Sequence, residues 1–426
     1  MQVACKQFKL LMGCILAGMK GIFGKNCWRL FLCILGLSLV FIVAGIRMCV
    51  MTKNSGAVLV HTSGASKGYV LISSYVAGEM LTDPGQVRLI DKEGHVVHEW
   101  KTKYKPLYSQ LEPNGHVFVA MTPPIHQLDY PSGGTTGLIE ELDWNGKVVW
   151  SYADSEMTHS FDVLPDGSVV YERWEQAPRS FASAVKGGMV VATTSVWTTG
   201  LVRIDKNNTT VWQWHLPDHL SASEYVLGAF TPRSDWSHIN SVEYVADNPL
   251  THTPAFLLSA RHISEAFFID AKTGKVLWQS QKGLFSMQHD ATYLQNGNVM
   301  VFDNGFDREH DFPLLRSRAI EINPVTNEIV WQYHGGTTFT EQAKLESSIM
   351  GGAQRLLNGN TLITVSVQGR IIEITKSGQV VWEYVEPSVD ASKQNPINFK
   401  SREYYPEGTL WGKWLPNFAF LDVLCH

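Results

Sequence analysis

Pairs of short apolar segments recur along most of the chain, each pair joined by a polar turn and ending in tryptophan. In each copy an apolar segment runs into a turn of Asp, Asn, Gly or Lys, and a second segment rich in β-branched residues follows. This is the pattern of a β-hairpin. The copies end at Trp100, Trp150, Trp212, Trp278, Trp331 and Trp382, with spacings of 50, 62, 66, 53 and 51 residues. Such spacings suit four-stranded propeller blades with loop insertions.

A second type of hairpin, without the tryptophan, alternates with the first. It reads SQLEPNGHVFVA at 109–120, SFDVLPDGSVVYE at 160–172, ATYLQNGNVMVFD at 291–303 and AQRLLNGNTLITV at 353–365. Together the two types predict five blades from about Leu107 to Glu386. Residues 69–75 and the first tryptophan hairpin supply three further strands. We expect a C-terminal segment, such as residues 418–423, to add the inner strand of a sixth blade and close the ring.

The pattern therefore predicts an all-β fold, a six-bladed β-propeller over residues 69–426. A formal net charge of −5 and the absence of long charged runs give no basic field, so nucleic acid is not an expected partner. Five of the six cysteines lie before residue 50, and only Cys425 falls in the predicted ring. This excludes a disulfide within the ring and a cysteine-based metal site.

The first 50 residues have a different composition. Residues 30–46 contain no charge, and with the following residues up to 51 they reach the ~20 residues that cross a bilayer. We predict a cytoplasmic basic segment at 1–28, one transmembrane helix as an anchor at 29–51 and a flexible stalk at 52–68. The basic residues before the anchor favour a cytoplasmic N-terminus and a propeller on the periplasmic, extracytoplasmic or lumenal side. A cleaved signal peptide is the alternative.

Three histidines occupy one register of the repeat. His159 and His289 each lie eight residues before a turn glycine, and His238 stands at the matching distance before the turn around Asp247. The register corresponds to the first residue of each inner strand, which faces the mouth of a propeller channel. We therefore expect the three imidazoles to meet, although any one of them alone would be more simply explained as a hydrogen-bonding group within its blade.

Arg261 ends the segment LLSAR at 257–261 and is expected to add a permanent cation. Three imidazoles form a familiar zinc site, but a neighbouring guanidinium would oppose a metal ion. An anion site uses all four residues, because a neutral imidazole can attack phosphorus or sulfur while arginine and protonated histidine hold the oxygens. The prediction is a catalytic site with no metal and no cofactor.

Several motifs, in order, resemble the PAPS-independent arylsulfate sulfotransferases, the ASST family. They are DWSHINSVEY at 235–244, LLSARH at 257–262, MQHDATYLQNGNVMVFDNG at 287–305, SRAIE at 317–321 and GGAQRLLNGNTLI at 351–363. The resemblance implies a six-bladed propeller that moves a sulfuryl group from a phenolic sulfate donor to a phenol acceptor through a sulfohistidine intermediate.

The resemblance also implies roles for individual residues. It places the nucleophile at His289 and makes His238, His159 and Arg261 its catalytic partners. Asn240 and Asn304 are implied as substrate-binding residues.

Two other functions remain open from the sequence. The segment FIDAKTGKVLW at 268–278 resembles the tryptophan-docking phrase of quinoprotein dehydrogenases, which bind PQQ in an eight-bladed ring, but only six such phrases occur here. A non-catalytic propeller that binds a protein or glycan is the second. It predicts that the three histidines can be replaced without consequence, and the fold alone does not separate these functions.

Overall fold

The structure, a computed structural model, divides the chain into two compact units, residues 1–54 and 55–426. It describes residues 56–406 except 77–79, 125–132, 191–194, 307, 309–316, 387–395 and 399. The predicted basic segment at 1–28 and the predicted anchor at 29–51 lie outside the described residues. Within the described ranges, no helix is both long and apolar enough to cross a membrane.

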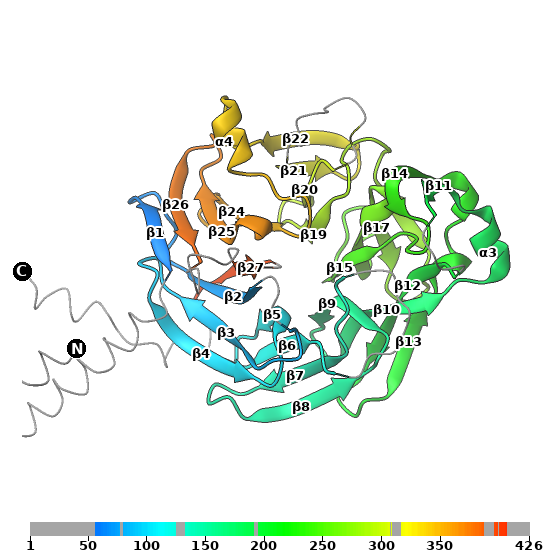
Figure 1. Cartoon of the computed structure of the whole chain (residues 1–426), viewed down its shortest axis with the longest axis horizontal. Helices are drawn as coiled ribbons and strands as arrows, with labels where there is room; N and C mark the ends of the chain where they lie inside the picture. The colour runs from blue at the N-terminus through cyan, green and yellow to red at the C-terminus, as the bar shows by residue number, and fades with distance from the viewer. Residues whose placement is uncertain are drawn as a thin grey trace, which may run out of the picture. The chain divides into compact units, whose positions relative to one another are not determined.

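Six antiparallel sheets form a ring, which confirms the predicted six-bladed propeller (Figure 1). Four of them have four strands each, running from the centre of the ring to its rim. The strands of these sheets are β5 (Pro106–Leu111), β6 (Val117–Met121), β7 (Leu138–Leu142) and β8 (Val148–Ala153); β9 (Met157–Val163), β10 (Val169–Gln176), β12 (Trp197–Ile204) and β13 (Thr210–Trp214); β15 (Ile239–Val245), β16 (Ala255–Ala260), β17 (Glu265–Asp270) and β18 (Val276–Gln279); and β19 (His289–Tyr293), β20 (Val299–Asp303), β21 (Arg318–Asn323) and β22 (Glu328–Tyr333).

Two inserted segments, one between β10 and β12 and one between β13 and β15, together form an insertion with a small sheet of its own. It consists of α3 (Arg179–Ala184), β11 (Lys186–Met189), the short 3-10 helices η2 (Leu216–Asp218) and η3 (Ala222–Glu224), and β14 (Val226–Pro232). β11 and β14 pair in parallel. The fully buried Trp236 packs edge-on against Phe181 and Tyr225 of this insertion. The insertion therefore anchors the segment that leads into β15.

The fifth sheet carries an additional strand at its rim. Its elements are β23 (Gly352–Arg355), β24 (Thr361–Val365), β25 (Arg370–Ile374), β26 (Val380–Val385) and β1 (Ala57–His61), with α4 (Phe339–Ala343) before the sheet and the 3-10 helix η5 (Ser366–Gln368) within it. β1 pairs antiparallel with β26. The stalk predicted at 52–68 is therefore wrong for residues 57–61, because their backbone groups complete the edge of this sheet.

The C-terminal segment closes the sixth sheet, as predicted, but with other residues. The sheet contains β2 (Tyr69–Val76), β3 (Gly85–Ile90), β4 (Val96–Thr102) and an inner strand in two pieces, β27 (Pro396–Asn398) and β28 (Arg402–Tyr404). Both pieces pair with β2. The segment proposed from its apolar pattern, 418–423, lies outside the described residues. A short, charged inner strand does not show the apolar alternation by which strands are recognised.

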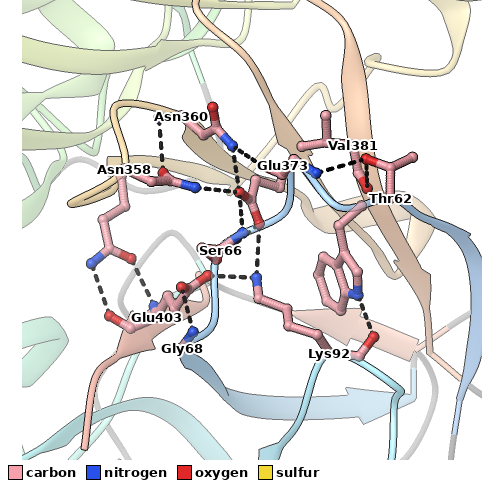
Figure 2. A network of polar contacts seen from close by, with 12 residues as sticks. Thr62, Ser66, Gly68, Lys92, Asn358, Asn360, Glu373, Val381 and Glu403 are labelled. Carbon is pink, nitrogen blue, oxygen red and sulfur yellow. Dashed lines mark hydrogen bonds and ion pairs between the residues drawn. The ribbon is translucent and has the colours of Figure 1, made fainter. Parts of the chain in front are cut away.

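A buried polar network joins the two ends of the propeller (Figure 2). Lys92, in the turn after β3, places its Nζ 2.9 Å from Glu373 of β25 and 2.5 Å from Glu403 of β28. The backbone N–H of Ser66 donates to Glu373 and that of Gly68 donates to Glu403, at 2.8 and 3.2 Å. Both carboxylates thus accept hydrogen bonds from Lys92 and from the backbone of the segment that joins the fifth and sixth sheets.

The recurring tryptophans have a common role. Several donate their indole N–H to the turn of the next blade: Trp100 to Asp143 O, Trp212 to Lys272 O, Trp278 to Asn327 Oδ1, Trp331 to Lys376 O and Trp382 to Lys92 O. The bond of Trp382 crosses the closure of the ring. Five of the six tryptophan hairpins therefore end in a residue that hydrogen-bonds to the neighbouring blade, and Trp150 is the exception within the described part of the chain.

Candidate active site

The three histidines lie at irregularities of the inner strands. The pairing register shifts near His159 in β9, next to His238 in β15 and at His289 in β19. His159 and His238 have φ angles of 43° and 48°, in the left-handed region. Bulges of this kind redirect side chains and are frequent beside active sites. The sequence register therefore predicted the positions, whereas the local backbone sets the direction of the rings.

His159 and His238 contact each other directly. Their Nε2 atoms lie 3.0 Å apart, and Nδ1 of His238 lies 2.5 Å from Oδ2 of the fully buried Asp235. Because the carboxylate can only accept, His238 carries its proton on Nδ1. Nε2 of His159 then donates to His238, and Nδ1 of His159 accepts from the Thr158 hydroxyl at 2.7 Å.

Arg261 belongs to the same cluster through a fourth histidine. Its Nη1 lies 2.7 Å from Nε2 of His262, whose Nδ1 donates to the Asp235 carbonyl at 2.7 Å. The rings of His262 and His238 are stacked with their centroids 4.5 Å apart. Asp235 therefore binds two imidazoles, one through its carboxylate and one through its backbone. The guanidinium of Arg261 therefore lies beside the histidine cluster.

His289 faces the same centre from the next blade. Its Nδ1 lies 2.7 Å from Oδ1 of Asn304, and its Nε2 accepts from the backbone N–H of Met350 at 3.2 Å. Burial lowers the pKa of His289 well below its ordinary value, and the charge of Arg261 lowers it further. A positive charge on His238 or His159 would also lower the pKa of His289, so the predicted residues share one electrostatic environment.

All four imidazoles are neutral at neutral pH for related reasons. Burial is the main cause of the low pKa of His159, followed by His238 and Arg261, and the pKa of His238 is depressed by burial and then Arg261. Burial lowers the pKa of His262 to about 3. The Asp235 carboxylate opposes this effect at His262. The site thus combines neutral bases with one guanidinium.

The two predicted substrate-binding asparagines lie beneath the histidines. Asn240 donates from Nδ2 to the backbone carbonyl of Gln288 at 2.9 Å, one residue before His289. Asn304 uses its amide on His289 and on two backbone carbonyls. Both are almost fully buried, and each contacts the His289 segment.

Other residues of the site were missed by the sequence reasoning. Asp235 and His262 fall inside the quoted motifs, three residues before His238 and one after Arg261, but nothing in their spacing indicates their contacts. Trp174 places its ring 6.4 Å from His159 and 6.1 Å from His238, between centroids. Trp174 belongs to β10, Asp235 to the segment before β15 and His262 to the turn after β16, so only the fold brings them together.

The acid and two imidazoles of Asp235, His238 and His262 also raise the question of a metal ion, because their ligand atoms lie within 4.8 Å of one another. The separation of 2.5 Å between Asp235 and His238 is that of a hydrogen bond. Tetrahedral zinc ligands, bound at about 2.1 Å, would lie roughly 3.4 Å apart. Arg261, bonded to the third residue, further disfavours a cation.

Ion pairs beside His289 line a cavity of about 960 Å³. Asp290, next to His289, binds Arg402 at 2.6 Å and Lys400 at 3.3 Å. The Lys400 ammonium also lies 4.2 Å from the ring centroid of Tyr108. Asp290, Arg402, Lys400 and Tyr108 all line the cavity, which opens toward the turns that end the inner strands. None of the predicted site residues lines it.

Comparisons with known proteins identify the family of the chain. A family model described as Arylsulfotransferase (ASST) matches residues 125–386, more than half of the chain. A comparison with curated proteins gives no match. Among solved structures, a protein of unknown function from Bacteroides caccae is 13% identical, with 79% of this chain and 99% of that chain covered and a TM-score of 0.47.

A virginiamycin B lyase from Staphylococcus aureus is 11% identical over 78% of this chain and 88% of that chain, with a TM-score of 0.41. At these identities the solved structures do not bear on function. The family match does, since it spans the blades that carry the histidine cluster, and the resemblance seen in the motifs is confirmed. The chain belongs to the arylsulfotransferase (ASST) family, a family of transferases.

Proposed function

We propose that this protein transfers a sulfuryl group from a phenolic sulfate ester to an acceptor phenol by a ping-pong mechanism, with a sulfohistidine formed on His289. The observation that carries the proposal is the pairing of a neutral His289 with the cation of Arg261 in one buried site. A neutral imidazole has the lone pair that a nucleophile requires, and the guanidinium suits an anionic sulfate.

In the first half-reaction, Nε2 of His289 forms a bond to sulfur while the bond between sulfur and the aryl oxygen breaks. The negative charge of the bound donor favours a protonated His159–His238 pair, which takes up one proton as the donor binds. The aryl oxygen keeps the electron pair and takes that proton, which leaves the pair neutral. In the second half-reaction, the acceptor phenol gives its proton to that pair as its oxygen attacks sulfur and the N–S bond breaks. Asp235, 2.5 Å from His238, stabilises the imidazolium that forms.

Arg261 has the role of holding the sulfuryl oxygens while charge shifts between the two aryl oxygens. The loss of one such contact costs on the order of 10²–10³ in rate. No cofactor or metal enters this scheme. The substrates are small phenolic molecules, and the predicted anchor at 29–51 would place the reaction on the extracytoplasmic or lumenal side of a membrane.

The alternatives have less support. A PQQ-dependent quinoprotein is expected to have eight blades, whereas the described residues form six blades and one small separate sheet. A non-catalytic binding module gives no reason for four imidazoles, a buried carboxylate and an arginine to meet at the channel.

The test is to mix the protein with p-nitrophenyl sulfate, quench the reaction and search its peptides by mass spectrometry for one added SO₃ group. We expect the group on the peptide that contains His289, and we expect His289→Gln to abolish both the adduct and transfer. His252→Gln is the matched control, because that histidine is exposed and its side chain contacts the exposed Asp247. Turnover without modification of His289 would reject this nucleophile.

A further inference from the structure

Asn304 follows β20 directly and is completely buried. Its Nδ2 lies 2.6 Å from the carbonyl oxygen of Ser347 and 2.8 Å from that of Met350. Its Oδ1 lies 2.7 Å from Nδ1 of His289. The side chain thus makes three hydrogen bonds, all of them to the protein.

These contacts fix the orientation of the amide. A carbonyl oxygen only accepts, so the atom that faces Ser347 O and Met350 O must be the NH₂ group, which has two hydrogens to donate. The reversed amide would place its oxygen against two oxygens and leave buried groups unpaired. The atom facing His289 is therefore an acceptor.

The orientation of the amide determines where the imidazole carries its proton. An acceptor at 2.7 Å requires a hydrogen on Nδ1, and a neutral imidazole has only one N–H. Nε2 must then hold the lone pair. The Met350 contact agrees independently, because its backbone N–H points at Nε2 from 3.2 Å and can only donate. Burial and Arg261, by lowering the pKa of His289, keep the ring neutral.

The loop that supplies these contacts is itself held in shape. Met350 and Gly351 have φ angles of 58° and 99°, and a Cβ at Gly351 would come within 2.8 Å of the Phe302 ring. The Ser347 hydroxyl donates to Ile349 O at 2.8 Å. The two carbonyls that orient Asn304 therefore belong to a rigid segment.

We propose that Asn304 is a positioning residue that sets the tautomer of His289, with hydrogen on Nδ1 and the lone pair on Nε2, instead of a substrate ligand. The inference rests on the proposed function and deepens it, because that tautomer leaves on Nε2 the lone pair that the proposed attack on sulfur needs, and in this structure the same lone pair accepts from the Met350 N–H. The substrate-binding role implied by the family resemblance does not fit an amide whose three hydrogen-bonding contacts are all internal.

The test uses two variants of the full chain and a readout independent of activity. Two-bond ¹H–¹⁵N correlations of histidine-labelled protein, with the His289 signals identified from His289→Gln, report the tautomer. We expect Nδ1–H at His289 in the wild type and loss of that single tautomer in Asn304→Leu, with kcat reduced about 10–100-fold. Asn304→Asp keeps an acceptor, so it should retain Nδ1–H and partly restore kcat.

The acid variant should also move the acid limb of the kcat/KM profile to higher pH, because a carboxylate beside Nδ1 stabilises the imidazolium. Ser347→Ala is the control for a general disturbance of the loop, since it removes a hydroxyl that does not touch Asn304; its tautomer signal and pH profile should stay in place. A wild-type spectrum with hydrogen on Nε2, or an unchanged tautomer in Asn304→Leu, would overturn the inference.

These outcomes separate the inference from the proposed function. If the wild type forms no sulfohistidine but His289 carries hydrogen on Nδ1 in an Asn304-dependent way, the proposed function fails and the assignment of the tautomer stands. If the sulfohistidine forms while the tautomer is independent of Asn304, only the positioning role is rejected.

Discussion

At the scale of single residues, Asp235 distinguishes the His159–His238 pair from two isolated imidazoles. A buried carboxylate hydrogen-bonded to Nδ1 favours a protonated ring, whereas burial and Arg261 favour a neutral ring. A proton carrier benefits from such a balance, because the proton must be both taken up and returned.

We expect Asp235→Asn to reduce kcat by about 10²–10⁴-fold, since a neutral amide cannot stabilise the imidazolium. The loss should be greater with phenyl sulfate as donor than with p-nitrophenyl sulfate, because p-nitrophenolate leaves without needing a proton. Steady-state rates with both donors measure this difference. An equal loss with both would show that Asp235 serves only to position His238.

Glu243 allows a prediction about stability at the same scale. Burial, followed by repulsion from Asp162, raises the pKa of Glu243 to about 8. A carboxyl whose pKa is raised by folding stabilises the folded state fully below its unfolded pKa of about 4.3, and this contribution is lost as the pH rises through 8.

We therefore expect Glu243→Gln to gain stability relative to the wild type as the pH rises from about 5 to 8, and to keep a constant advantage above that. The glutamine oxygen can still accept the Tyr293 N–H that Glu243 accepts at 2.9 Å. Urea unfolding at several pH values gives the difference. Glu328→Gln, at an exposed position, should show no such trend.

At the scale of elements, the tryptophan hairpins show why the repeat was readable from the sequence. In five of the six hairpins the final tryptophan donates a hydrogen bond to the next blade, so the spacing of the tryptophans follows the spacing of the blades. β28 could not be predicted from the sequence, because its charged residues form contacts with residues far along the chain, as Arg402 does with Asp290. Asp235 was not predicted either, although its partner His238 is only three residues away, because the contact depends on the irregular backbone before β15.

Replacing Trp212 by Phe removes its hydrogen bond to Lys272 O and should lower the free energy of unfolding by about 1 kcal/mol beyond the loss in packing. Trp150→Phe is the matched control. Trp150 is also half-buried, and its indole N–H has no hydrogen-bond partner among the residues that the structure describes. Urea unfolding of both variants tests the role of the bond; equal losses would contradict it.

At the scale of the whole molecule, the ring depends on its closure. Lys92 is nearly buried between Glu373 and Glu403, which come from strands about 300 residues away along the chain. Removing one partner from such a cluster is costly because the remaining charges stay buried. The two ends of the propeller are thus tied by side chains as well as by strands.

We expect Lys92→Met to lower the free energy of unfolding by about 3–5 kcal/mol. Arg203→Met, which breaks a more exposed ion pair with Asp166, should cost less than about 1 kcal/mol. Denaturant unfolding followed by tryptophan fluorescence compares the two. A similar small loss in both would mean that the strands alone close the ring.

The ion pairs of Asp290 with Lys400 and Arg402 have one more consequence. They extend from the fourth blade to the sixth, and Lys400 reaches the first blade at Tyr108. An aromatic molecule in the cavity of about 960 Å³ would meet these ion pairs and none of the predicted site residues, because those residues do not line the cavity. For the transfer proposed above, a donor and an acceptor that leave these ion pairs intact would therefore have to approach the histidines from the opposite end of the propeller.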